Sequence, residues 1–251
     1  MDTFPAALQA PPLSLLAVEP MRALLDYFAA RVGCEALPIG DGHPVIVYPG
    51  LGGGAFTTSH LRRFLADSGF TVHDWDGGIN TGPTGLLDDW LGAMEQRVRD
   101  LHREHARKVS LVGWSLGGVY AREIAKRCAE CVRQVVTLGT PFASLAGGSH
   151  AGTVYRLLNG DTSQLTPELE ARLRACPPVP TTSIYSKTDG IVPWRGCIEK
   201  KTVSSESVEV SASHLGMGTH PQVLRIVANR LAQPEGRWRP LRRSERLGRR
   251  R

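Results

Sequence analysis

The sequence predicts an α/β protein with a doubly wound, mostly parallel sheet of about six strands and helices on both faces. First, short apolar runs alternate with amphipathic helical stretches from about residue 44 onward. Second, these runs are continuously apolar, which is typical of strands buried on both faces. Third, the 251 residues, 41% hydrophobic and 22% charged, suit one globular domain of this kind.

The expected strands are short runs rich in β-branched side chains, and several of them end at glycine, proline or polar residues. They are residues 45–48, 70–75, 109–112, 135–138, 182–185 and 207–210. The expected helices lie between them and after them, with apolar side chains at helical spacing. They are residues 60–67, 86–105, 116–129, 166–175 and 221–231. A strand therefore leads into a helix repeatedly, as a parallel sheet requires.

Three segments are expected along the chain. Residues 1–43 form an N-terminal segment with a short helix, residues 44–236 the α/β domain, and residues 237–251 a basic, disordered tail. Within the domain, residues 141–180 are longer than a simple crossover needs, which predicts a lid-like helical insertion. A decorative excursion without a binding role is the alternative.

The net charge of +6 belongs to the tail and not to the fold. Residues 237–251 hold eight arginines and one glutamate, a net charge of +7, so all other residues together carry −1. Such a segment suits an anionic partner, whether nucleic acid, anionic lipid or an acidic protein, and a solvated chain end is the alternative. We expect no specific nucleic-acid binding.

Cysteine usage and hydropathy point to a soluble cytoplasmic protein. The five cysteines cannot all pair within one chain, and Cys128-x-x-Cys131 lies at a predicted helix end, so we expect inert thiols. No stretch reaches the roughly 18 apolar residues that a membrane-spanning helix needs. The N-terminus lacks the basic start of a secretory signal.

The strongest functional signal is Gly113-Trp114-Ser115-Leu116-Gly117, which fits G-x-S-x-G and lies between a predicted strand and a predicted helix. On a tight turn at that junction, the Ser115 hydroxyl would project above the sheet edge. It would lie at a helix N-terminus, whose dipole favours developing negative charge. A glycine-rich turn with an incidental serine is the alternative. We expect Ser115 to be a nucleophile.

A serine nucleophile needs a base. Where such a serine lies on a strand-to-helix turn, the partner acid and then the histidine follow later in the chain. Asp189 follows the fifth predicted strand and His214 the sixth, so both lie beyond the carboxyl ends of strands, where open α/β sheets bind ligands. We expect Asp189 to orient His214, and His214 to move the proton of Ser115. His220 and Asp161 are the weaker alternatives.

Acyl transfer also needs donors for the oxyanion of the tetrahedral intermediate. The first strand leads into a glycine-rich loop, residues 49–54, where such a fold supplies one backbone N–H. We expect Leu51 to be that donor, with Gly52 as the alternative, and Leu116 to be the second. Neither G-x-x-x-x-G-K-[ST] nor G-x-G-x-x-G is present, so a nucleotide site is not expected.

Four residues are candidates for the wall of a substrate pocket: Gly52, Trp75, Trp114 and Trp194. Tryptophan walls would suit an apolar acyl or alcohol group. Each tryptophan is equally well explained by plain packing.

Five motifs in order resemble the lipase/esterase branch of the α/β-hydrolases. They are residues 48–53 (YPGLGG), 112–118 (VGWSLGG), 138–142 (LGTPF), 188–193 (TDGIVP) and 213–214 (SH). The resemblance spans about residues 44–232. It implies a Ser115–Asp189–His214 triad and lipase-like cleavage of a carboxylic ester. Because no strand is expected before Val45, the sheet resembles that of small lipases.

Three function classes remain open at this point. The first is hydrolysis of a small apolar or lipid-like ester through an acyl-enzyme, with no metal and no organic cofactor. The second is amide or thioester cleavage, or acyl transfer, on the same triad. The third is a non-catalytic binding protein that keeps the fold. The complete set of nucleophile, acid and base favours an enzyme.

Overall fold

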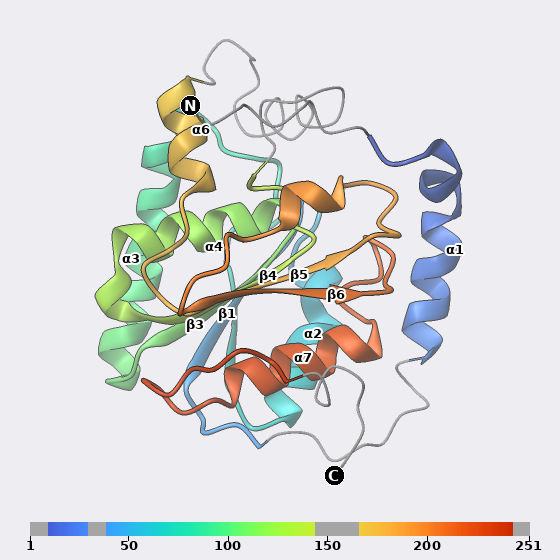
Figure 1. Cartoon of the computed structure of the whole chain (residues 1–251). Helices are drawn as coiled ribbons and strands as arrows, with labels where there is room; N and C mark the ends of the chain where they lie inside the picture. The colour runs from blue at the N-terminus through green and yellow to red at the C-terminus, as the bar shows by residue number, and fades with distance from the viewer. Residues whose placement is uncertain (1–9, 30–38, 144–165, 243–251) are drawn as a thin grey trace.

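The structure, a computed structural model, describes residues 10–29, 39–143 and 166–242 (Figure 1). Its sheet contains all six predicted strands, every pair parallel, in the order β2-β1-β3-β4-β5-β6. The strands are β1 (Pro44–Tyr48), β2 (Thr71–Asp74), β3 (Val109–Trp114), β4 (Val132–Leu138), β5 (Thr181–Ser186) and β6 (Ser205–Val210). The predicted doubly wound α/β class is therefore confirmed.

Helices cover both faces of this sheet. The α-helices are α1 (Leu13–Ala29), α2 (Ala55–Asp67), α3 (Leu87–His105), α4 (Leu116–Arg127), α6 (Pro167–Arg174) and α7 (Pro221–Leu231), and two 3₁₀ turns are η1 (Ala129–Cys131) and η3 (Trp194–Cys197). Helices α3 and α4 lie on one face, and α2 and α7 on the other (Figure 1). Strand β1 shows why: Ile46 and Tyr48 enter the core under α3 and α4, whereas Val45 and Val47 enter the other core.

The strand order changes direction between β1 and β3. After β1 the chain adds β2 on one side, and from β3 onward it adds β4, β5 and β6 on the other. The chain therefore continues from β1 and from β3 to helices on opposite faces of the sheet, α2 and α4. Open α/β sheets bind their ligands at such a switch point.

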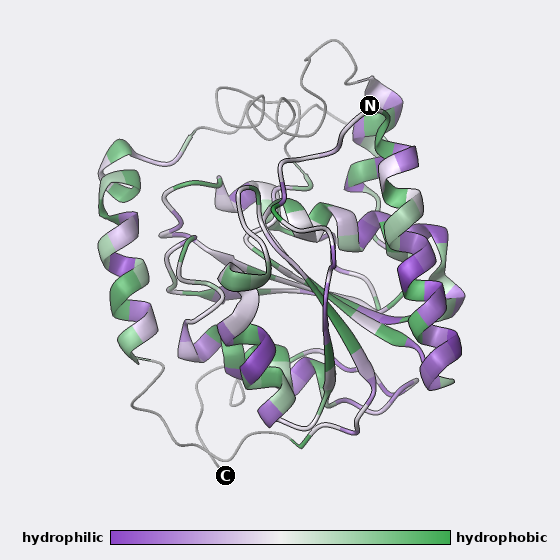
Figure 2. Cartoon of the chain, turned by 180° about the vertical axis from the view of Figure 1, so that it is seen from behind, coloured by the Kyte–Doolittle hydropathy of each residue, from purple (hydrophilic) through white to green (hydrophobic). Residues whose placement is uncertain are grey.

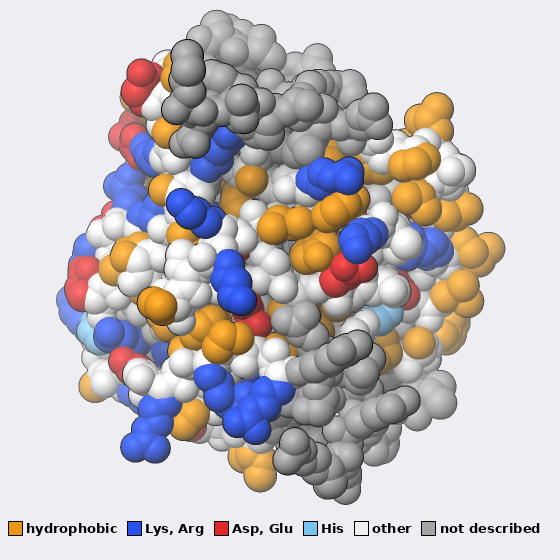
Figure 3. Space-filling model, viewed as in Figure 1, with side chains coloured by type: hydrophobic (Ala, Val, Ile, Leu, Met, Phe, Trp, Pro, Cys, Tyr) orange, Lys and Arg blue, Asp and Glu red, His pale blue; other side chains and the backbone are white. Residues whose placement is uncertain are grey.

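The N-terminal helix is longer than the short helix expected from the sequence. Helix α1 has 17 residues and continues through Pro20, although proline disfavours a helix interior. Its charged side chains point toward the domain, and Glu19 is only 1% exposed. Large apolar side chains of α1, such as Met21 and Phe28, are exposed instead. Figure 2 shows that the helix carries both hydrophobic and hydrophilic residues, and Figure 3 shows hydrophobic side chains along its outer edge. Contacts with distant loops, which no local pattern reveals, hold this helix.

The first part of the expected disordered tail packs on the domain. Leu241 is 5% exposed, and its N–H donates to Glu206 Oε2 at 2.8 Å. Glu206 also forms a buried ion pair with Arg230 of α7, 2.9 Å apart, and Arg230 donates to the carbonyl of Arg239. Residues 237–242 are thus part of the fold, and residues 243–251 lie outside the described residues.

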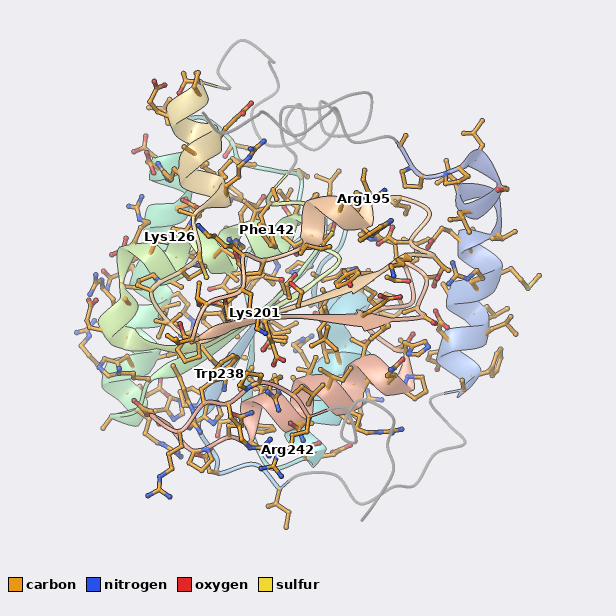
Figure 4. All side chains as sticks on the ribbon, viewed as in Figure 1. Lys126, Phe142, Arg195, Lys201, Trp238 and Arg242 are labelled. Atoms are coloured by element: carbon orange, nitrogen blue, oxygen red, sulfur yellow. The ribbon has the colours of Figure 1, made fainter. Side chains whose placement is uncertain are left out.

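Most of the predicted lid-like insertion, residues 144–165, also lies outside the described residues. Its described helix, α6, is tied to α3 and α4. Arg172 of α6 forms ion pairs with Glu123 and Asp88, each at 2.7 Å, and Leu173 is buried in the core beneath α3 and α4. Lys126 of α4 donates to the carbonyl of Arg172 (Figure 4). Helix α6 therefore packs on the same face of the sheet as α3 and α4.

The four cysteines in the described ranges are free. Burial raises the pKa of Cys128 to about 12, so this thiol stays protonated at neutral pH. Among the residues placed by the structure, no helix is both long enough and apolar enough to cross a membrane.

Candidate active site

Ser115 occupies a strained turn between β3 and α4. Its φ of 52° and ψ of −120° are unusual for a residue with a side chain, and it is the N-cap residue of α4. The turn brings the start of α4 against β1, where a Cβ on Gly117 would lie only 2.5 Å from the carbonyl oxygen of Tyr48. Only glycine permits this approach. The turn has the geometry of a nucleophile elbow.

Asp189 and His214 form a buried, hydrogen-bonded pair. The Nδ1–H of His214 donates to Asp189 Oδ2 at 2.7 Å, and the two residues are 4% and 3% exposed. The other carboxylate oxygen of Asp189 accepts the N–H groups of Ile191 and Val192 at 2.9 and 2.7 Å. Because a carboxylate only accepts, the imidazole carries its proton on Nδ1 and leaves Nε2 free to act as a base.

The charge around His214 shifts its pKa upward. Burial disfavours the imidazolium and lowers the pKa, but the charge of Asp189, the hydrogen bond that the imidazole donates to that carboxylate and the charge of Glu19 together outweigh it. The pKa of His214 therefore lies above the ordinary 6.5. A raised pKa strengthens the base while still allowing it to return the proton.

The end of β4 brings Ser115 and His214 together. The N–H of Ser115 donates to the carbonyl of Leu138 at 2.8 Å. The next residue, Gly139, has φ 54°, and a Cβ there would lie 3.0 Å from His214 Nδ1 and 3.2 Å from Asp189 Oδ2. From the elbow, Trp114 donates its indole N–H to the carbonyl of His214 at 3.1 Å. The three sequence-predicted residues thus converge on one strand end.

The glycine-rich loop after β1 lies against the elbow. A Cβ on Gly50 would be 3.2 Å from the Cβ of Ser115 and 3.9 Å from its Oγ. The N–H of Gly52 is engaged, because it donates to the carbonyl of Asn80 at 2.7 Å, and Gly53 donates to Gly50. This leaves Leu51 as the better placed donor of the two considered. Leu116 is the first residue of α4, and first-turn N–H groups have no partner within the helix.

Asn80, which sequence reasoning missed, fixes this loop. It is fully buried, and its side-chain amide donates to the carbonyl of Pro49 at 2.9 Å. Its Oδ1 accepts the hydroxyl of Tyr120, on α4, at 3.1 Å, and its backbone pairs with Gly52 and Gly53. Asn80 therefore links the loop to α4. No local motif marks it, since its partners are distant in sequence.

The candidate pocket residues Gly52, Trp75 and Trp114 differ in how far they are buried and in what they contact. Trp75 is 4% exposed and packs in the core beneath α3, and it does not border the cavity beside Asp189 and Trp194. A Cβ on Gly77 would lie 2.7 Å from the Trp75 ring, and the Trp75 indole N–H donates to the carbonyl of Gly78 at 3.1 Å. Trp114 is half-buried between the elbow and the His214 loop. Gly52 is exposed at the mouth of the loop.

Trp194, on η3, does line a cavity. Its ring stacks on Tyr185 and lies under the guanidinium of Arg195 (Figure 4). The cavity has a volume of about 200 Å³ and also borders Asp189, Lys187 and the residues that lead into α1. It lies beside the acid of the pair and does not reach Ser115.

Of the two weaker alternatives, only His220 lies within the described residues. His220 caps the N-terminus of α7 through Nδ1, which accepts the N–H of Gln222 at 3.2 Å. Asp161 lies outside the described residues. Within the described ranges, no group of three or more His, Cys, Asp or Glu side chains is arranged to hold a metal ion.

The fold is shared with solved hydrolase structures. Lipase B of Aspergillus fumigatus superposes with a TM-score of 0.59 at 16% identity, over 80% of this chain and 55% of that one. The mature lipase BlEst2 of Bacillus licheniformis gives 0.57 at 17%, over 80% and 96% of the two chains. The thioesterase domain from the curacin biosynthetic pathway gives 0.54 at 12%, over 77% and 92%.

Sequence comparison identifies a family for this chain but no individual curated relative. No curated protein matches the chain. The profile of the palmitoyl protein thioesterase family matches residues 44–188, more than half of the chain, and this stretch contains the loop after β1, the elbow at Ser115 and the end of β4. The chain therefore belongs to the palmitoyl protein thioesterase family and has the α/β-hydrolase fold of lipases and esterases.

Proposed function

We propose that the protein is a serine hydrolase that cleaves the ester bond of a lipid-like or small apolar acyl group. One observation carries this proposal: the buried Asp189–His214 pair meets the strained Ser115 turn at the end of β4. A purely structural ion pair would not need a serine held in an unfavourable backbone conformation beside it.

The proposed reaction has two halves. Ser115 Oγ attacks the acyl carbonyl carbon while His214 Nε2 takes the hydroxyl proton, and the N–H groups of Leu51 and Leu116 stabilise the oxyanion. The intermediate collapses, the bond to the leaving group breaks, and His214 returns the proton to that group. Water then attacks the acyl-enzyme by the same route, releasing the free acid and regenerating Ser115.

Thioesters are the second candidate substrate class, favoured by the family match. The same residues serve both bonds, because the acyl half and the oxyanion are identical. A thiolate leaving group needs less help from the protonated His214 than an alkoxide does, so the two classes are separated by their dependence on this acid.

Matched substrates test the proposal. Ester, thioester and amide compounds that share one medium-chain acyl group are compared with the wild type, Ser115→Ala and His214→Ala. We expect ester or thioester turnover that Ser115→Ala abolishes and amide turnover far below both. Ester turnover by Ser115→Ala near the wild-type rate would contradict the proposed nucleophile.

A further inference from the structure

Helix α1 turns its charged side chains inward and its apolar side chains outward, the reverse of an ordinary surface helix. Glu19, Arg22 and Asp26 are spaced three and four residues apart, so they share one face. The outward face carries exposed side chains such as Leu24 and Phe28, each 51% exposed. Hydrophobic side chains gather along this outer edge in Figure 3. Polar contacts therefore attach this helix to the domain.

Glu19 is the most buried of these groups and binds two loops at once. Its Oε1 accepts the N–H of Gly190 at 2.7 Å and that of His214 at 3.1 Å. Its Oε2 accepts the N–H of Leu215 at 3.1 Å. One carboxylate thus joins the residue after Asp189 to His214 itself, although these loops follow different strands.

Arg22 and Asp26 extend the same attachment outward. Arg22 donates to the carbonyl and hydroxyl oxygens of Thr188, which precedes Asp189. Asp26 Oδ2 accepts the N–H and hydroxyl of Ser213, which precedes His214, at 3.1 and 2.7 Å. One helix face thus contacts both loops, at the residues on either side of Asp189 and at residues 213–215.

We infer that Glu19 is a positioning residue of the active site, whose buried carboxylate fixes the Asp189 and His214 loops relative to each other. The inference rests on the proposed function. A buried carboxylate is costly unless donors satisfy it, and here backbone N–H groups of the two loops supply charge-assisted bonds. Moving either loop would break a bond to this charge, so the helix resists separation of the acid from the base.

The charge of Glu19 also reaches the imidazole. The ionisable groups that face His214 are Asp189, from the loop after β5, and Glu19, from α1, and the charges of both favour the imidazolium. The other two charged residues of this helix face have different partners. The guanidinium of Arg22 lies 4.0 Å from the carboxylate of Glu19, and the carboxylate of Asp26 lies 3.8 Å from the imidazole of His220. Removing the charge of Glu19 therefore weakens one of the two anionic influences on the base.

Glu19→Gln tests the inference with a change of charge and donor pattern but not of shape. The amide retains one acceptor oxygen, so it cannot satisfy all three N–H groups. We expect kcat to fall by about 10- to 100-fold with KM nearly unchanged, because a small displacement of reacting groups has costs of this order. The ascending limb of the pH profile moves to lower pH. Met21→Ala, on the exposed face of α1, is the matched control and retains wild-type kinetics.

Glu19→Asp separates reach from charge and keeps the test decisive if Glu19→Gln does not fold. The shorter carboxylate retains the charge but cannot span both loops, so kcat falls while the pH limb stays in place. Folded Glu19→Gln or Glu19→Asp with wild-type kcat and pH profile would overturn the positioning role. Failure of the wild type to react at Ser115 would overturn the proposed function instead, so the two failures are distinguishable.

Discussion

Replacing Asp189 by asparagine isolates the role of the acid from the fold that surrounds it. The amide oxygen can occupy the place of Oδ1 and still accept the N–H groups of Ile191 and Val192. The amide nitrogen then faces Nδ1 of His214 across the present 2.7 Å contact. Because an amide NH₂ donates, Nδ1 must become an acceptor, and the imidazole proton moves to Nε2. The base that should receive the Ser115 proton is then blocked.

The expected loss is about 10⁴-fold in kcat, equal to about 5 kcal/mol of transition-state stabilisation. Steady-state turnover of a soluble acyl ester at saturating substrate measures it, and a thermal melt establishes that the variant is folded. The melting temperature should change little, since the two backbone donors stay satisfied. A folded variant with less than a tenfold loss would refute the assigned role of Asp189 as the group that sets the His214 tautomer.

Three further results are expected. Gly139→Ala should lower kcat at least tenfold, because its Cβ would press on His214 Nδ1 at 3.0 Å and its φ of 54° disfavours alanine. Wild-type kinetics in this variant would show that the end of β4 does not position the Asp189–His214 pair. In the wild type, kcat/KM should rise with pH through a limb above 6.5, since only neutral His214 accepts the Ser115 proton and its pKa is raised; a limb below 6.5 would contradict this. Ending the chain at residue 236 should cost about 2 kcal/mol of unfolding free energy in urea, from the lost burial of Leu241. Ending it at Arg242 keeps that contact and serves as the control, and equal stabilities of the two chains would show that Leu241 contributes nothing.

Local patterns in the sequence were sufficient to predict the strands of the sheet and the candidate site residues at the strand ends. The buried apolar runs predicted every strand, although β4 begins at Val132, three residues earlier than expected, because Arg133 and Gln134 interrupt the apolar pattern. Helix α2 begins at Ala55, where Thr57 and Gly54 exchange hydrogen bonds at its start. That start carries too few apolar residues to be recognised.

Residues that act through distant contacts could not be predicted in this way. Glu19 contacts Gly190 and His214 from the other end of the chain, and Asn80 contacts Pro49, which lies 31 residues before it. Helix α1 continues past Pro20 because Glu19 before the proline and Asp26 after it contact the loops that carry Asp189 and His214. Such anchoring is a property of the folded chain and leaves no local periodicity.

Labelling with a fluorophosphonate tests the central claim most directly, because the reagent reports an activated serine without knowledge of the substrate. The wild type, Ser115→Ala and His214→Ala are treated in parallel, and the modified residue is located by mass spectrometry. The account predicts one adduct, on Ser115, that forms at a much lower rate in His214→Ala. An unlabelled wild type, or an adduct on Ser115 that forms equally fast without His214, would contradict the assembly of Ser115, His214 and Asp189 into one active site.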